Sequence, residues 1–166
     1  MAINFPEGQQ DYPGFLHRVV SDTKLDTFTT TSTSFVTISG LSATISPRST
    51  ASQILIICDL SLWAQNAQAG FVQLMRGSTP IYIGDASGNR TRNSFAGVYS
   101  HGSPTNETNQ CTAVFLDTPS TTSSTTYSVR CKTINNQVCV NRSSHDPNSS
   151  DMARHSSSIT LIEVDS

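Results

Sequence analysis

The sequence is poor in charge, in helix-forming residues and in long apolar runs. Only 13% of its 166 residues are charged, and the formal net charge is -2. This balance gives no electrostatic reason to expect nucleic acid or an anionic membrane as a partner. No run approaches the roughly 18 apolar residues of a membrane-spanning helix, and residues 1–7 lack the basic and apolar segments of an export signal. We therefore expect no nucleic-acid partner and no membrane partner.

The cysteines also lack a metal-binding pattern, because none of the four forms a Cys-x-x-Cys pair. Cys131 and Cys139 fall on the two arms of an expected hairpin around residues 134–137, and one register places their side chains opposite each other. A disulfide there requires tight geometry and is opposed by a reducing cytoplasm. The sequence leaves open whether these two cysteines form a disulfide.

What the sequence has in abundance is Ser and Thr interspersed with Val, Ile and Phe, a composition that favours strands. Residues 41–45, 110–116 and 127–132 alternate between apolar and polar side chains and are bounded by turn residues. Residues 53–63 are apolar on both faces in their first half, which predicts a central strand half covered by another layer. Residues 158–164 are also apolar on both faces, which predicts a last strand buried in a sheet or in a subunit interface.

About eight to ten such short strands and no convincing helix predict an all-β fold. We expect a single antiparallel β-sandwich, jelly-roll-like, over residues 21–166. Residues 1–20 hold Pro6 and Pro13 among apolar residues with no steady period, and are expected to form an extended N-terminal arm. Such an arm is either a frayed end or a docking peptide. In the second case its docking residues are Ile3, Phe5, Tyr12, Phe15 and Leu16.

No pattern in the sequence points to catalysis. Neither Gly-x-Ser-x-Gly nor a phosphate-cradling glycine loop occurs, and serine alone carries no meaning in a chain so rich in it. Residues 143–155 include His145, Asp146, Asp151 and His155, but their spacing matches no metal-ligand template, so a hydrated loop is expected. We expect no catalytic residue, no metal and no cofactor.

Exposed side chains in the long polar loops are the candidates for binding. Arg90 and Arg92 are two residues apart and project from the same side of an extended segment, where they can grip a carboxylate or phosphate or pair with an acidic neighbour. Trp63 and Tyr99 can stack on a sugar ring, although Trp63 ends a core strand and is more often a packing residue there. Loops on β scaffolds are where binding specificity usually varies.

Several segments, in order along almost the whole chain, resemble a family of small virion proteins from marine and freshwater bacteriophages, including cyanophages. The opening Met1-Ala-Ile-Asn-Phe-Pro is similar to the start of such proteins, and residues 19–36 are similar to their first hairpin. Further segments continue the pattern: residues 41–56, 74–79, 84–90, 116–119, 127–129, 140–143 and 157–164. The sequence departs from the family at Cys111, Cys131 and Cys139, where the family usually has small or aliphatic residues.

The resemblance implies a virion component with no catalytic residues and a domain similar to trimeric jelly rolls. Under this interpretation the protein is a homotrimeric tail or fibre appendage subunit of a virion assembled in the bacterial cytoplasm. The arm would anchor it to other virion proteins, and outward residues would contact a host surface glycan or protein. The candidate outward contacts are Arg90, Arg92, Tyr99, His145 and Asp146. Two alternatives stay open, a capsid decoration protein and a carbohydrate-binding module.

Overall fold

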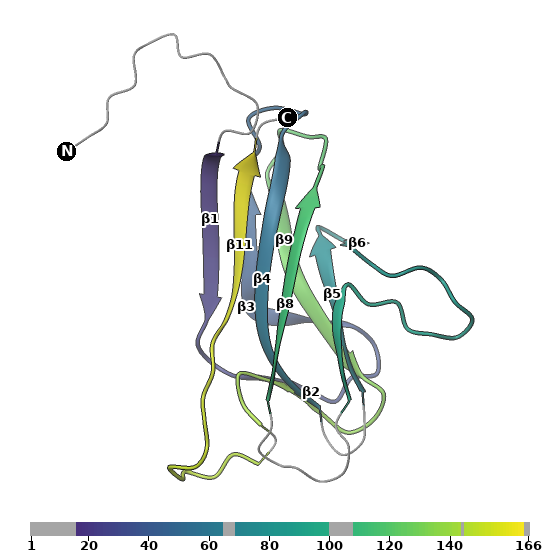
Figure 1. The fold of residues 1–166 in the computed structure, drawn as a ribbon, viewed down its shortest axis with the longest axis vertical. Coiled ribbons are helices and arrows are strands. Elements are labelled where there is room, and N and C mark those ends of the chain that lie inside the picture. The colour runs from purple at the N-terminus through teal and green to yellow at the C-terminus, as the bar shows by residue number, and fades with distance from the viewer. Residues whose placement is uncertain (1–15, 65–68, 100–107, 144, 165–166) are drawn as a thin grey trace, which may run out of the picture.

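The computed structural model describes residues 16–64, 69–99, 108–143 and 145–164, which form two antiparallel sheets packed face to face (Figure 1). These residues contain no helix, and hence none long and apolar enough to cross a membrane. The expected all-β fold, a jelly-roll-like antiparallel sandwich, is confirmed. Within it the chain passes repeatedly from one sheet to the other, as between β3, β4 and β5.

The first sheet is built around one long strand, β4 (Gln53–Ala64). On one side the first half of β4 pairs with β11 (Ser157–Val164), and β11 pairs with the edge strand β1 (Leu16–Lys24). The second half of β4 pairs with β10 (Val138–Val140), which pairs in turn with β2 (Phe28–Thr30). On its other side β4 pairs with β8 (Asn109–Asp117).

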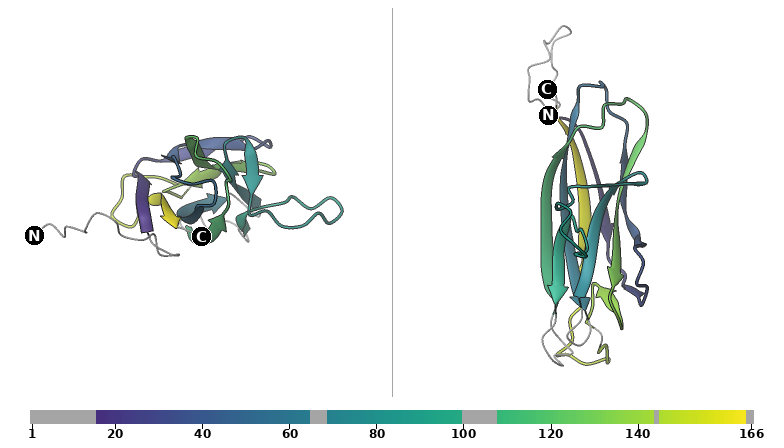
Figure 2. Two further views of the ribbon diagram at one scale, coloured as in Figure 1. Left: turned by 90° about the horizontal axis from the view of Figure 1, so that it is seen from above. Right: turned by 90° about the vertical axis from the view of Figure 1, so that its right-hand side faces the viewer.

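The second sheet has the order β3 (Val36–Ile45), β9 (Thr125–Thr133), β5 (Ala69–Arg76) and β6 (Thr79–Ile81). A further strand, β7 (Phe95–Tyr99), also pairs with β5. Figure 2 shows the two layers from above and from the side. Gly40 has a φ of 72° and lies within the register shift between Thr37 and Ser42, so the strand expected over residues 41–45 is the second part of a longer, irregular strand.

The core lies between the two sheets and consists of alternate residues of each long strand. In β4 these are Ile54, Ile56, Cys58, Leu60 and Leu62, all with 0% exposure. Fully burying one such aliphatic side chain is worth about 1.5–3 kcal/mol, so β4 supplies a large share of the driving force. The expectation that residues 53–63 form a central strand is confirmed.

The hairpin expected between residues 127–132 and 138–140 does not form. β9 belongs to the second sheet and β10 to the first, so the chain crosses between layers at residues 134–137. Asn136, with a φ of 56°, lies at this crossing, where Asn tolerates the left-handed conformation better than most residues. Cys131 and Cys139 therefore lie in different sheets, and both are free thiols.

The first strand overlaps the region expected to form the arm. β1 begins at Leu16, so residues 16–20 belong to the first sheet, where they pair with β11 and where Val20 packs against the core. The remaining arm residues, including Ile3, Phe5, Tyr12 and Phe15, lie outside the described residues.

A buried polar cluster joins β8 of the first sheet to the second sheet. Asp117 accepts a 2.7 Å hydrogen bond from the Tyr127 hydroxyl. It also forms an ion pair with Arg76, in which 2.9 Å separates the Arg76 Nη1 and Asp117 Oδ1 atoms. Burial and the hydrogen bond to Asp117 raise the pKa of Tyr127 above its usual value, so the hydroxyl stays protonated as a donor. Arg76 thus balances the negative charge of Asp117, and the Asp117 oxygens are hydrogen-bonded, as a buried carboxylate requires.

We expect Tyr127→Phe to lower the free energy of unfolding by about 1.5–3 kcal/mol, because it removes one buried hydrogen bond to a charged group. Urea unfolding measures this change. Tyr82→Phe is the matched control, because the Tyr82 ring is half exposed and its hydroxyl makes no hydrogen bond to the described residues. Equal effects of the two substitutions would contradict the stabilising role given to the Tyr127–Asp117 bond.

Candidate assembly surface

The outer face of the first sheet carries a continuous set of apolar side chains. Strand register aligns Val19 with Ile162, Ile162 with Leu55, and Leu55 with Leu116, which makes one row across four strands. In the next row Ile57 lies opposite Val114. We call this set the apolar outer face; its members are Val19, Leu55, Ile57, Val114, Leu116 and Ile162.

These side chains point outward because their neighbours along each strand point into the core. Ile54 and Ile56 flank Leu55, Ala113 precedes Val114, and Leu161 precedes Ile162, and all four neighbours are buried. Residues adjacent in a strand project to opposite faces, so the outer side chains have no described layer above them. In Figure 1 strands β1, β11, β4 and β8 lie side by side in front of β3 and β9.

The apolar outer face is largely open to solvent. Val19 is 59% exposed, Val114 58%, Leu116 45% and Ile57 36%, while Leu55 and Ile162 are partly buried. Full burial of one such side chain is worth about 1.5–3 kcal/mol, so each half-exposed one forgoes roughly 1 kcal/mol. Single exposed apolar residues are ordinary on a protein surface, but a contiguous group of them marks an interaction site.

Polar side chains that bond to one another border the apolar outer face on one side. The Ser21 and Thr160 hydroxyls lie 2.9 Å apart, and Thr112 donates a 3.0 Å hydrogen bond to Asp59. The bordering carboxylate is therefore already bonded, and the six members of the face carry no charge. A partner that covers this face need not leave a bare charge in an apolar contact.

Comparison with known proteins gives a distant structural likeness and no family. No protein-family model and no curated protein sequence matches the chain. Among solved structures the chain is similar to one described as the structure of infectious bursal disease virus Gx strain, with 15% identity and a TM-score of 0.47 over 98% of this chain and 42% of that one. A crystal structure of the infectious bursal disease virus VP2 subviral particle gives 16% identity and a TM-score of 0.46 over 100% of this chain and 42% of that one. The chain thus spans about two fifths of the length of these viral proteins.

The two arginines of the predicted contact set lie in a loop between β6 and β7 that projects from the sandwich (Figure 1). Arg92 donates a 2.6 Å hydrogen bond to the Gly84 carbonyl, and Arg90 donates a 2.9 Å hydrogen bond to the Ser87 hydroxyl. The Gly84 amide also bonds the Asn93 carbonyl at 3.0 Å. Both side chains are exposed, and each bonds within its own loop instead of joining the other in a shared anion site.

His145 and Asp146 lie in a different loop, which the structure does not bring next to Arg90 and Arg92 (Figure 1). Asp146 forms an ion pair with Arg154, and Arg142 lies 3.6 Å from its second oxygen. The hydrogen bond from Arg154, followed by the charges of Arg154 and Arg142, holds the pKa of Asp146 below its usual value.

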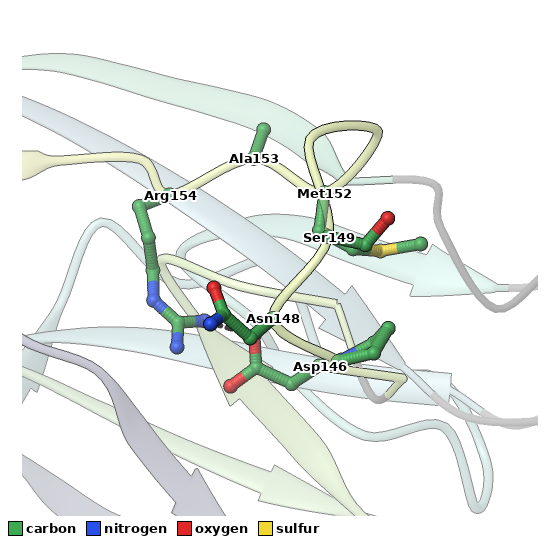
Figure 3. A pocket seen from close by; sticks show the side chains of 7 residues that line it. Asp146, Asn148, Ser149, Met152, Ala153 and Arg154 are labelled. Carbon is green, nitrogen blue, oxygen red and sulfur yellow. Dashed lines mark hydrogen bonds and ion pairs between the residues drawn. The ribbon is translucent and has the colours of Figure 1, made fainter.

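An open hollow of about 330 Å³ lies beside this ion pair, and Figure 3 shows Arg154 reaching toward Asp146 next to it. The hollow is lined mainly by polar and small side chains, and the one carboxylate and one guanidinium that line it are paired with each other. It therefore offers a ligand no unpaired charge. Across the described residues no three His, Cys, Asp or Glu side chains come close enough to hold a metal ion.

The two aromatic candidates do not form a described sugar platform. Trp63 is buried at the end of β4 and is therefore a packing residue, as the sequence favoured. Tyr99 ends β7, where its backbone is paired with that of Ala69, and its side chain is outside what the structure describes.

Sequence reasoning missed a cluster on the outer face of the second sheet. Lys132 extends its ammonium over the rings of Phe35 and Phe71, at 5.2 and 5.5 Å from their centroids, and Arg130 lies over Phe35 at 5.1 Å. Arg130 also donates two hydrogen bonds to Gln73, of 2.7 and 2.9 Å. The rings and cations stabilise one another across β9 and its neighbours. The sequence shows Arg130 and Lys132 on one face of a strand, but Phe35 and Phe71 reach them only through long-range pairing.

We expect only Cys111 to react with a thiol reagent such as DTNB in the native protein at pH 8. Burial raises the pKa of Cys58 and of Cys131 to about 12, and it also raises the pKa of the buried Cys139 thiol. Cys111 is partly exposed, although its pKa is raised as well, so its reaction is slow. Cys111→Ser should remove the reaction of the native protein, and all four thiols of the original chain should react in denaturant. If only two thiols react in denaturant, the other two form a disulfide, which would contradict the structure.

Proposed function

We propose that this chain is a structural subunit of a virus particle, without catalytic activity, and that it assembles through its apolar outer face. The observation that carries the proposal is the row of half-exposed Val, Leu and Ile side chains across β1, β11, β4 and β8. An apolar face exposed to water does not stabilise a monomer, whereas covering the face with another subunit lowers the free energy of the assembly.

The chemistry of the rest of the described surface supports the same proposal. The prominent cations are bound to their own neighbours: Arg76 to Asp117, Arg154 to Asp146, and Arg130 to Gln73. The described thiols and the buried tyrosine have raised pKa values, which is the reverse of the activation that nucleophilic catalysis needs. A sandwich whose prominent cations are bonded to their own neighbours and whose first sheet has an open apolar face suits a role in assembly.

At a finer level we propose a bacteriophage tail or fibre appendage subunit that forms a homotrimer and is anchored by its N-terminal arm. The family resemblance in the sequence supports the phage assignment. A closed ring of three copies also covers apolar surface without leaving open strand edges. The projecting loop that carries Arg90 and Arg92 is held by hydrogen bonds within itself, which suits an outward contact with a host surface. Copy number per particle separates this role from that of a capsid decoration protein, which is present in many more copies.

We expect Val114→Glu in the full chain to weaken self-association by at least about tenfold. The substitution places a carboxylate in the middle of the apolar outer face, where association strips it of water without giving it a partner, and tenfold corresponds to about 1.4 kcal/mol. Sedimentation velocity over a range of concentrations measures the association.

Gln110→Glu is the matched control. Gln110 lies on the same strand and the same side as Val114 but beyond the apolar outer face, so its substitution adds the same charge and should leave association unchanged. Equal weakening by both substitutions would point to a general effect of charge. A full chain that remains monomeric at every concentration would contradict the proposed assembly.

A further inference from the structure

We propose that the apolar outer face is the docking site for residues 1–15 of a neighbouring copy of this chain. The inference rests on the proposed function, because it needs copies that associate. It adds the identity of the occupant, a peptide segment of the chain itself, and it predicts that the copies exchange their arms.

The arm has the composition that such a face binds. Ile3, Phe5, Tyr12 and Phe15 are apolar or aromatic, and Glu7 and Asp11 are the only charged side chains among residues 1–15. The face offers Val, Leu and Ile side chains and no charge. Burying one aromatic ring against it removes more apolar surface from water than burying any single member of the face.

The place where the arm joins the sandwich supports the same assignment. β1 begins at Leu16 on the edge of the first sheet, and Val19, three residues later, already belongs to the apolar outer face. Fifteen residues of extended chain reach about 50 Å, whereas four strands measure about 15 Å across. The arm is therefore longer than the face beside which it starts, and it has the length to reach the next copy.

The two prolines of the arm restrict the way in which it can bind. Pro6 and Pro13 lack an amide hydrogen and are an odd number of residues apart, so a regular strand that ran through both would lose a hydrogen bond to the edge of β1 or of β8. Its contribution comes instead from side chains laid over the face. This mode matches the structure, which offers outward Val, Leu and Ile side chains across all four strands rather than along one edge.

Photocrosslinking in the full chain tests the proposal. p-Benzoylphenylalanine replaces Phe5, and the protein is assembled from an equal mixture of ¹⁵N-labelled and unlabelled chains before illumination. We expect crosslinked peptides that join the arm to residues 53–59, 112–117 or 158–164 and that contain one labelled and one unlabelled chain. Val114→Glu should reduce these crosslinks at least about tenfold, in proportion to the weakened association. The control places the probe at the exposed Thr122, which should give none of them.

The outcomes separate this proposal from the one on which it rests. If sedimentation shows oligomers but the arm crosslinks elsewhere or not at all, the arm is not the occupant, and assembly through the face still stands. If the crosslinks reach the face only within one chain, arm exchange is wrong. If the protein does not associate at any concentration, the proposed function fails together with the exchange.

Discussion

The structure depends on one constraint, which is that a sandwich can cover only one face of each of its sheets. Residues along a strand project alternately to the two faces, so a strand that is apolar at every position has half of its apolar side chains outside. β4 and β11 are apolar on both faces over part of their length: Ile54, Ile56 and Leu161 fill the core, while Leu55, Ile57 and Ile162 lie on the outer surface. The second sheet covers the inner face. On the outer face Ser61 and Trp63 at the end of β4 are buried, but no described layer covers the first half of the strand.

The sequence predicted the strands better than it predicted their partners. Apolar residues on both faces of residues 53–57 and 158–164 were visible, and both segments are paired on two sides within the first sheet. The expectation of another layer over β4 was wrong for the outer face of its first half, where Ile57 is exposed, because periodicity reports that a side chain is apolar and not what lies above it.

The errors in the expected topology have the same origin. Residues 127–132 and 138–140 look like a hairpin because they are close in the sequence and alternate well. Each strand nevertheless gains more by filling the core from a different sheet, and the chain crosses over between them. The arm boundary failed for a related reason, since Val20 is recognisable as a core residue only once β11 lies beside it.

The candidate contact residues show what sequence can say about a surface. Arg90, Arg92, His145 and Asp146 are exposed, as loop residues usually are, but hydrogen bonds and ion pairs within their own loops occupy both arginines and Asp146. The apolar outer face was not predicted, although all of its members except Val19, which was assigned to the arm, lie in segments recognised as strands. Its members are contributed by β1, β4, β8 and β11, and only the pairing of these strands brings them together.

The most direct test of the apolar outer face as the surface of association is hydroxyl-radical footprinting of the full chain at high and at low concentration. The oxidation of Leu55, Ile57 and Leu116 should fall as the protein associates. Leu25 and Ile134, which are exposed elsewhere on the sandwich, should remain equally reactive and serve as internal references. If Leu116 stays as reactive as Leu25 while the mass increases, the copies associate through another surface, and the central claim is contradicted.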